Sequence, residues 1–192
     1  MRRLLLMTFV MVLGAGVALA QELPGGRIGI FGENTGTTCS VIDAAPGLLN
    51  VYVVQVGTAG SAACQYKAAK PACFPATYLS DSSPFSVVIG NSQTGVSIGY
   101  GSCRVGAVHV QTIAFFATGT TPACCLYTLG CDPLSSTEAC ALGYVDIVDC
   151  TQSPAFAKPQ VGVINVNGTC ACIDIVAEQE SSWGQIKALY VE

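Results

Sequence analysis

Short runs of apolar residues recur along the chain, and many of them alternate with polar residues. The clearest run is L-L-N-V-Y-V-V-Q-V at 48–56, where β-branched and aromatic side chains recur with a period near two. Turn-forming residues such as G-N-S-Q-T-G at 90–95 separate nearly every run from the next. The other strands predicted in this way cover 27–31, 64–68, 85–89, 96–100, 107–117, 124–129, 144–148, 161–166 and 169–176.

Many short strands divided by turns are typical of an antiparallel β-sandwich or barrel. No long helical period interrupts them, which argues against a parallel α/β sheet. One hairpin is predicted across 161–176, because Asn167-Gly168 tolerates the two positive φ angles of a type I′ turn. We therefore expect a mainly β fold, an antiparallel β-sandwich.

The two ends of the chain depart from this pattern. Residues 1–20 combine Arg2-Arg3, an apolar run and a closing A-L-A, which is the pattern of a cleaved secretory signal peptide rather than a membrane anchor. In residues 181–192, a helix would place Trp183, Ile186, Leu189 and Tyr190 on one face. Gly184 weakens the prediction of a helix, so a final extended strand is the alternative. We expect a β-sandwich domain over 21–180 and a short helix or tail over 181–192 that packs on it.

Composition narrows the classes of partner. Lys and Arg number 8 against 12 Asp and Glu, and only 10% of the residues are charged, well below the roughly 25% usual in soluble domains. An acidic chain of this kind argues against nucleic-acid binding, which requires clustered Lys and Arg. Beyond the signal segment no apolar run is long enough to span a membrane. We expect a secreted, periplasmic or cell-surface protein.

The chain contains 11 cysteines, and with an export signal these predict disulfides rather than metal ligands. Because the number is odd, at least one thiol stays free or pairs between chains, so the sequence leaves open covalent self-association as well as pairing through an edge strand. All of them are disulfide candidates: Cys39, Cys64, Cys73, Cys103, Cys124, Cys125, Cys131, Cys140, Cys150, Cys170 and Cys172.

Cysteines close in sequence suggest two pairings. Cys64 with Cys73, and Cys131 with Cys140, would each close a short proline-containing loop, worth about 2–3 kcal/mol in the chain-entropy model. Cys124 and Cys125 are adjacent, so on a strand they would point to opposite faces and take separate partners. The outward member of that pair is the first candidate for the unpaired thiol.

Two apparent catalytic signals are weak. Gly95 to Gly99 matches G-x-S-x-G, but a nucleophile elbow needs a strand before Ser97 and a helix after it, and neither is predicted. His109 is the only histidine, and no acidic residue lies between it and Ser97. We interpret His109 as a strand residue with one hydrogen bond rather than as the base for a cysteine nucleophile.

Metal and cofactor motifs are also missing from the sequence. There is no C-x₂₋₄-C pair, no H-x₃₋₅-H, no P-loop, no G-x-G-x-x-G and no calcium loop. Cys170 and Cys172 would share a strand face and could in principle bind a soft metal, but two separate disulfides are the favoured interpretation. We therefore assign no catalytic, cofactor or metal residue.

Several segments resemble a group of exported bacterial proteins. They are G-L-L-N-V-Y-V-V at 47–54, V-I-G-N-S-Q-T-G at 88–95, Y-G-S-C at 100–103, V-D-C at 148–150 and W-G-Q-I-K-A-L-Y at 183–190, the last similar to their C-terminal W-G-x-I-K-x-L-Y segment. The resemblance brings no activity and no site residue. The strand order also resembles cohesin-like and immunoglobulin-like sandwiches, which implies a fold and not a function.

The sequence favours a non-enzymatic binding or structural module of the envelope or extracellular space, whose partner is a protein or a glycan. A carbohydrate-binding module is the first alternative, because such modules use exposed aromatic side chains. An exported hydrolase or thiol enzyme is the second. The aromatic residues available to a carbohydrate site are Tyr52, Tyr66, Tyr78, Tyr100, Tyr144 and Trp183.

Overall fold

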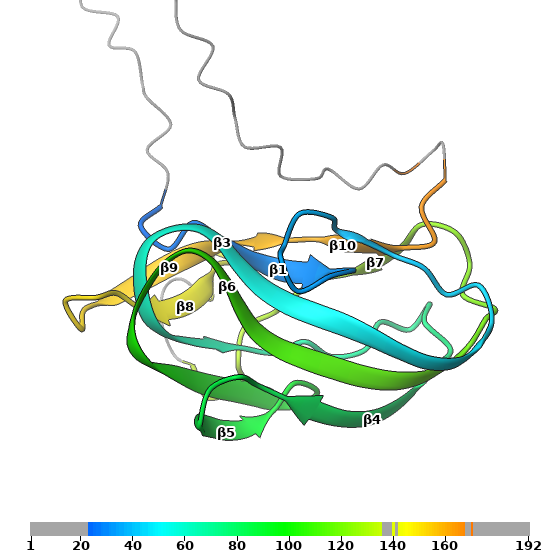
Figure 1. The fold of residues 1–192 in the computed structure, drawn as a ribbon, viewed down its shortest axis with the longest axis horizontal. Helices are drawn as coiled ribbons and strands as arrows, with labels where there is room; N and C mark the ends of the chain where they lie inside the picture. Colours follow the sequence, from blue (N-terminus) through cyan, green and yellow to red (C-terminus); the bar gives the residue numbers. More distant parts are fainter. Residues whose placement is uncertain (1–22, 136–139, 141, 168–169, 171–192) are drawn as a thin grey trace, which may run out of the picture.

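A computed structural model of the chain describes residues 23–135, 140, 142–167 and 170 (Figure 1). The expected signal peptide at 1–20 and the expected helix or tail at 181–192 lie outside these residues. The same holds for most of the second strand of the hairpin predicted across 161–176.

The described residues form ten strands, so the expected mainly β fold is confirmed. Two of these strands, β3 and β6, are much longer than the rest and run antiparallel to each other. The strands are β1 (Arg27–Phe31), β2 (Ser40–Val41), β3 (Pro46–Tyr66), β4 (Thr77–Ser82), β5 (Val87–Asn91), β6 (Gly95–Thr118), β7 (Cys125–Tyr127), β8 (Val145–Val148), β9 (Pro154–Gln160) and β10 (Gly162–Ile164).

Strands β3 and β6 each contribute to both layers of the sandwich. The first half of β3 pairs with β1 and the second half of β6, while its second half pairs with β8 and the first half of β6. Both strands bend sharply between these halves, and Figure 1 shows them curving round one end of the molecule. The β3–β6 register shifts repeatedly between Val53 and Ala63. These bulges allow the bend, because each inserts extra backbone into one strand.

Four further pairings complete the main sheet. Strand β1 also lies parallel to β9, and β9 pairs with β8, so β3, β1, β9 and β8 form a closed circuit. Strands β4 and β5 both pair with β6, at its two different halves. A separate small sheet has the order β2-β10-β7, with β10 parallel to β2 and antiparallel to β7.

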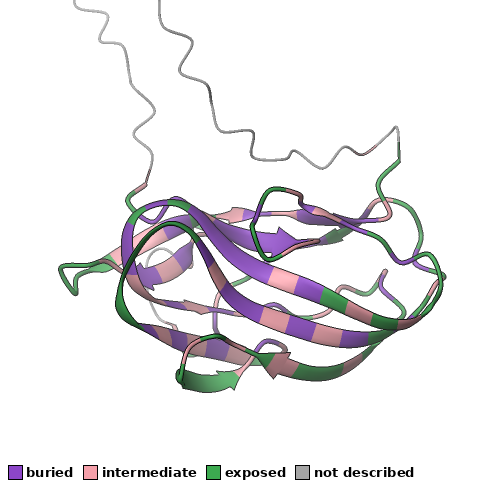
Figure 2. Cartoon of the chain, in the orientation of Figure 1, coloured by how far each residue is buried: buried purple, intermediate pink, exposed green. Residues whose placement is uncertain are grey.

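The hydrophobic core lies between the layers (Figure 2). In the first half of β6, from Gly95 to Tyr100, partly exposed and buried residues alternate, as the period-two pattern predicts. Phe115 lies at the centre of an aromatic cluster and contacts Phe74, Tyr78 and Tyr127 edge to face. Together these side chains close the interior with the geometry that aromatic pairs prefer.

The sequence pattern predicted each of the two long strands as two separate strands, and it did not predict three shorter strands. The runs predicted at 48–56 and 64–68 belong to the single strand β3, because Gly57 takes a positive φ of 63° without ending the pairing. Likewise 96–100 and 107–117 are both part of β6. Strands β2, β4 and β9 were not predicted, since β2 has two residues, β4 is largely polar and β9 contains two prolines.

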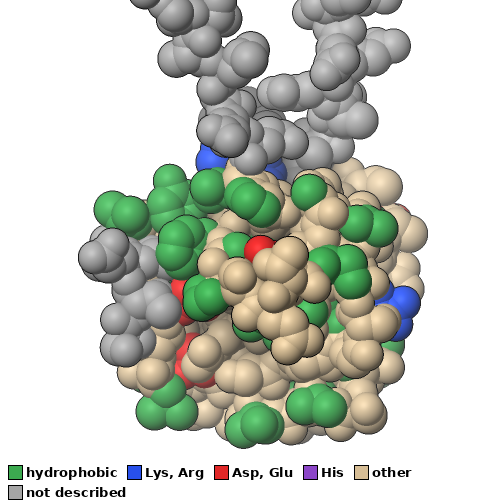
Figure 3. Space-filling view, turned by 90° about the vertical axis from the view of Figure 1, so that its left-hand side faces the viewer, with side chains coloured by type: hydrophobic (Ala, Val, Ile, Leu, Met, Phe, Trp, Pro, Cys, Tyr) green, Lys and Arg blue, Asp and Glu red, His purple; other side chains and the backbone are tan. Residues whose placement is uncertain are grey.

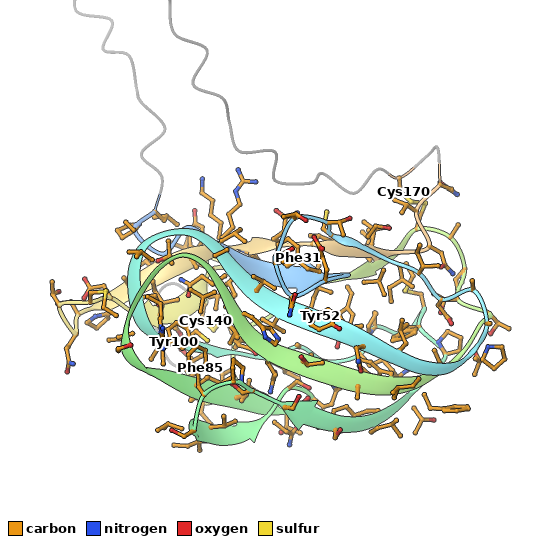
Figure 4. The ribbon with its side chains drawn as sticks, viewed as in Figure 1. Phe31, Tyr52, Phe85, Tyr100, Cys140 and Cys170 are labelled. Carbon is orange, nitrogen blue, oxygen red and sulfur yellow. A yellow bond between two sulfur atoms is a disulfide. The ribbon has the colours of Figure 1, made fainter. Side chains whose placement is uncertain are left out.

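Four disulfides join described residues, and one expected pairing is among them. Cys131 is bonded to Cys140 with a Cα–Cα distance of 5.4 Å. The other bonds are Cys73–Cys125, Cys103–Cys150 and Cys124–Cys170. Cys39 is also disulfide-bonded. Figure 4 shows Cys140 and Cys170 toward opposite ends of the sandwich, so the bonds are spread over the molecule.

The expected Cys64–Cys73 bond is wrong. Cys64 is a free, buried thiol, because its strand register places it beside Ile98 and Ile147 on the core side of the sheet. The prediction that the unpaired thiol belongs to the Cys124–Cys125 pair is wrong as well. Those two cysteines do take separate partners, but both are bonded.

Candidate functional site

A hollow of about 190 Å³ lies on the outer face of the sheet formed by β5, the first half of β6, the second half of β3, and β8. All four strands contribute to its lining, which is largely apolar. We call it the trough. It is defined by the lining residues at the outward-facing positions of these strands: Ala63, Gln65, Val87, Ile89, Ser97, Gly99, Asp146 and Val148.

Two rows of residues that cross the four strands explain the shape of the trough. The strand registers place Val87, Gly99, Ala63 and Val148 side by side in one row. Because the two central strands carry only a hydrogen and a methyl group here, the floor is low. The branched side chains of β5 and β8 form the walls, about 14 Å apart at roughly 4.8 Å per strand spacing.

The second row gives the trough a polar side. It runs from Ile89 through Ser97 and Gln65 to Asp146, again one residue from each strand. Asp146 accepts a hydrogen bond from the hydroxyl of Ser135, which holds the carboxylate at the rim. Along a strand, the two rows are two residues apart, about 6.6 Å. A ligand that lies along the strands would therefore contact the apolar row first and the hydrogen-bonding row next.

The core-facing row beneath the trough makes its floor rigid. Ile98, Cys64 and Ile147 lie side by side there and are buried. Burial raises the pKa of the Cys64 thiol to about 12. The thiol is therefore protonated at neutral pH, and Cys64 is no nucleophile because nucleophilic attack requires the thiolate.

The two residues of the weak catalytic signals lie in different halves of β6. Ser97 is in the trough, on a strand that pairs with β3 and β5, and not at a strand-to-helix turn. His109 pairs with Val54 in the other half, and its Nε2 lies 3.0 Å from the Thr112 hydroxyl. Burial lowers the pKa of His109. The arrangement fits the strand-histidine interpretation, and no Ser–His pair is formed.

The tyrosines named for a carbohydrate site do not form an exposed platform in the described part of the chain. Tyr66 and Tyr100 are buried, and each donates a hydrogen bond to a buried amide oxygen, of Gln111 at 2.8 Å and Gln55 at 2.9 Å respectively. The other three, Tyr52, Tyr78 and Tyr144, are only partly exposed. Trp183 lies outside the described residues.

Neither a metal cluster nor a membrane helix is found where the structure describes the chain. No three His, Cys, Asp or Glu side chains come close enough there to hold a metal ion. Cys170, once a conceivable soft-metal ligand, is bonded to Cys124, and Cys172 lies outside the described part. None of the described residues forms a helix long and apolar enough to cross a membrane.

No protein-family model matches the chain, and no curated protein matches it either. Solved structures that resemble it include the seventh ScaB type I cohesin from Pseudobacteroides cellulosolvens, at 15% identity and TM-score 0.47 over 76% of this chain and 94% of that one. A cohesin module from a Clostridium perfringens family 33 glycoside hydrolase has 8% identity, TM-score 0.49 and coverages of 74% and 96%. A type II cohesin from the Acetivibrio cellulolyticus cellulosome has 11% identity, TM-score 0.48 and the same coverages.

The trough was not predicted from the sequence. Its residues come from four strands, and the sequence does not reveal the register between these strands. Three of the residues, Ala63, Ser97 and Gly99, are small and carry no sequence signal of a binding site. The one usable signal was V-V-I at 87–89, where β-branched residues occupy both faces of a strand.

Proposed function

We propose that this chain is a non-enzymatic binding module that holds an extended segment of another protein in the trough. The shape of the trough carries this proposal: a low floor of Gly99 and Ala63 lies between walls of Val87 and Val148. A hollow of this volume with an apolar lining is suited to one or two aliphatic side chains.

The spacing of the two rows favours an extended peptide. Side chains on one face of an extended chain recur every two residues, about 6.6 Å apart. An aliphatic side chain over Gly99 and Ala63 would therefore place the next one on its face over Ser97 and Gln65, which offer hydrogen bonds. We expect a ligand sequence with an aliphatic residue followed two positions later by a polar one.

The chemistry of the described side chains supports binding without catalysis. The Cys64 thiol is buried and protonated, and Ser97 and His109 lie in separate halves of β6. The four disulfides support a secreted or cell-surface location, because such bonds persist in oxidising compartments.

Selection from a displayed library of random peptides tests the proposal. We expect the wild-type protein to enrich peptides with the aliphatic-x-polar pattern. Ala63→Leu fills the floor of the trough and should weaken the binding of an enriched peptide by at least about tenfold, about 1.4 kcal/mol. Ala69→Leu makes the same change at an exposed position outside the trough and should leave binding unchanged.

Two results would contradict the proposal. One is the absence of any enriched peptide, and the other is equal binding by Ala63→Leu and the wild type. A glycan array run in parallel decides the carbohydrate alternative: hits there that Ala63→Leu retains would place the function elsewhere on the molecule.

A further inference from the structure

We infer that two copies of this chain associate through strand β5, edge to edge and antiparallel, so that the β5–β6–β3–β8 sheet continues from one copy into the next. The inference does not depend on a peptide ligand in the trough. It rests on the open edge of β5, on the side chains that β5 exposes, and on the absence of the features that normally protect an edge.

The outer edge of β5 is open among the residues that the structure describes. Strand β5 pairs with β6 through Val87 to Asn91, and no other described strand pairs with it. In an antiparallel pair, alternate residues direct their N–H and C=O groups away from the partner strand. The outer edge of β5 therefore presents donors and acceptors to which another strand can bind.

Three consecutive apolar residues of β5 are exposed. The exposed fractions are 53% for Val87, 39% for Val88 and 70% for Ile89. Exposure of neighbouring β-branched residues on both faces of one strand leaves apolar surface uncovered, and a second strand beside β5 would cover it on both faces.

Among the described residues, strand β5 lacks the features that protect β4, the other open strand paired with β6. Strand β4 has a register shift beside Leu79 and carries Asp81 between Ser80 and Ser82. These are the bulge and the charge with which proteins discourage edge pairing. Strand β5 pairs with β6 without a shift, and the chain has no charged residue between Asp81 and Arg104.

The open edge is held in place at both ends. At its start the Phe85 ring stacks on Tyr100 at a centroid distance of 4.7 Å, with the Arg104 guanidinium 5.7 Å from the Phe85 centroid; Figure 4 shows Phe85 and Tyr100 together. At its end Ser92 donates two hydrogen bonds to Asp81, from the backbone N–H at 2.6 Å and from the hydroxyl at 2.8 Å. A fixed edge loses little conformational entropy when a partner strand binds.

The partner that this edge fits is a second copy of itself. An antiparallel pair centred on Val88 places Val88 against its own counterpart on one face and Val87 against Ile89 of the second copy on the other. Every contact in this arrangement joins two β-branched apolar residues, which is a favourable cross-strand pair. The neutral edge also avoids like-charge repulsion between two copies of an acidic chain.

Covalent self-association through the odd cysteine has no such support. Cys64, the one free cysteine among the described residues, is buried on the core side of β3, so its thiol does not reach a second molecule. Association through β5 needs no free thiol.

The test is the concentration-dependent mass of the full chain, measured without any ligand by sedimentation equilibrium. We expect the wild type to dimerise reversibly. Val88→Lys and Val88→Glu each oppose like charges at the two-fold axis and should each raise the dimer dissociation constant by at least about tenfold. Because Val88 is not a trough residue, peptide binding should persist in both variants.

Mixing the two variants separates a broken interface from a misfolded protein. A mixture of Val88→Lys and Val88→Glu should form a heterodimer, because the opposed charges then attract. The matched control Val105→Lys changes a side chain that is 65% exposed on the bend of β6 and should dimerise like the wild type.

The inference is overturned if the wild type stays monomeric up to high micromolar concentration, or if Val88→Lys dimerises as well as the wild type. It is also overturned if the mixed variants, shown to be folded by near-ultraviolet circular dichroism, form no heterodimer. Amide hydrogen exchange gives a measurement without mutation. The outward N–H groups of β5 should exchange more slowly as protein concentration rises, and exchange that does not change with concentration would contradict the pairing.

Discussion

At the scale of single residues, neighbours across the sheet decide what each cysteine does. Cys64 and Cys73 lie nine positions apart, yet Cys64 is buried beside Ile98 and Ile147 while Cys73 is bonded to Cys125. Sequence distance predicted the Cys131–Cys140 bond because the loop between them is short. It could not predict bonds such as Cys103–Cys150, whose partners are 47 positions apart and meet only after the sheet has formed.

The buried thiol of Cys64 should make the protein less stable at alkaline pH. Its pKa is raised from 9.0 to about 12 in the folded state, so above pH 9 the unfolded chain releases this proton while the folded chain keeps it. The contribution of the protonated Cys64 thiol to the free energy of unfolding is fully present below pH 9. Above pH 9 it is lost by up to ~1.4 kcal/mol per pH unit. Urea unfolding of the wild type and Cys64→Ala from pH 8 to 10 should show a steeper decline in the wild type. Parallel declines would contradict the role of burial.

At the scale of elements, apolar alternation predicted strands well and their connections poorly. Strand β1 was predicted with its observed bounds, and β5, β7, β8 and β10 within a few residues. The trough could not be predicted because it depends on register. The pairs Ala63–Gly99 and Ala63–Val148 follow a series of bulges in β3 whose number the sequence does not reveal.

The close packing of β1 against β9 gives a test at this scale. A Cβ atom on Gly29 would lie 2.1 Å from the backbone oxygen of Gln160, on the neighbouring parallel strand. Since backbone does not yield easily, we expect Gly29→Ala to lower the free energy of unfolding by about 2–4 kcal/mol, as for other overpacked sites.

Gly130→Ala is the matched control for that substitution. Its new methyl group would have only the Lys67 oxygen near it, at 4.0 Å, so we expect a change of no more than about 0.5 kcal/mol. Thermal unfolding of both variants measures the difference. Equal melting temperatures would show that β1 and β9 lie farther apart than the structure has them.

At the scale of the whole molecule, the protein is characterised by several disulfide bonds and by a low content of charged residues. The end of the molecule where β3 and β6 bend has few charged side chains among many polar and apolar ones (Figure 3). The composition therefore predicted the character of the surface, and together with the strand pattern it predicted the β-sandwich. It could not predict that two strands serve both layers, since a glycine such as Gly57 resembles a turn in the sequence.

The Cys103–Cys150 bond restrains the end of the molecule where β3 and β6 bend. It joins Cys103, in the bend of β6, to Cys150, in the turn between β8 and β9. We expect the double variant Cys103→Ala/Cys150→Ala to lose about 2–4 kcal/mol of unfolding free energy, since the bond closes a long loop in the unfolded chain. Chemical denaturation under non-reducing conditions measures the loss. An unchanged midpoint with an unchanged slope would show that the remaining disulfides already restrain this end.

The bend of β3 also bears on how the chain can vary in length. Between Gln55 and Ala63 the pairing with β6 shifts three times, and the positive-φ Gly57 has no other atom within 4 Å of where a side chain would begin. One residue added or removed there would enlarge or shrink a bulge and leave both halves of the strand facing as before. The same change between Val51 and Val53 would turn every following side chain to the other face. Relatives of this protein should therefore differ in length at the bend and keep constant spacing on either side of it.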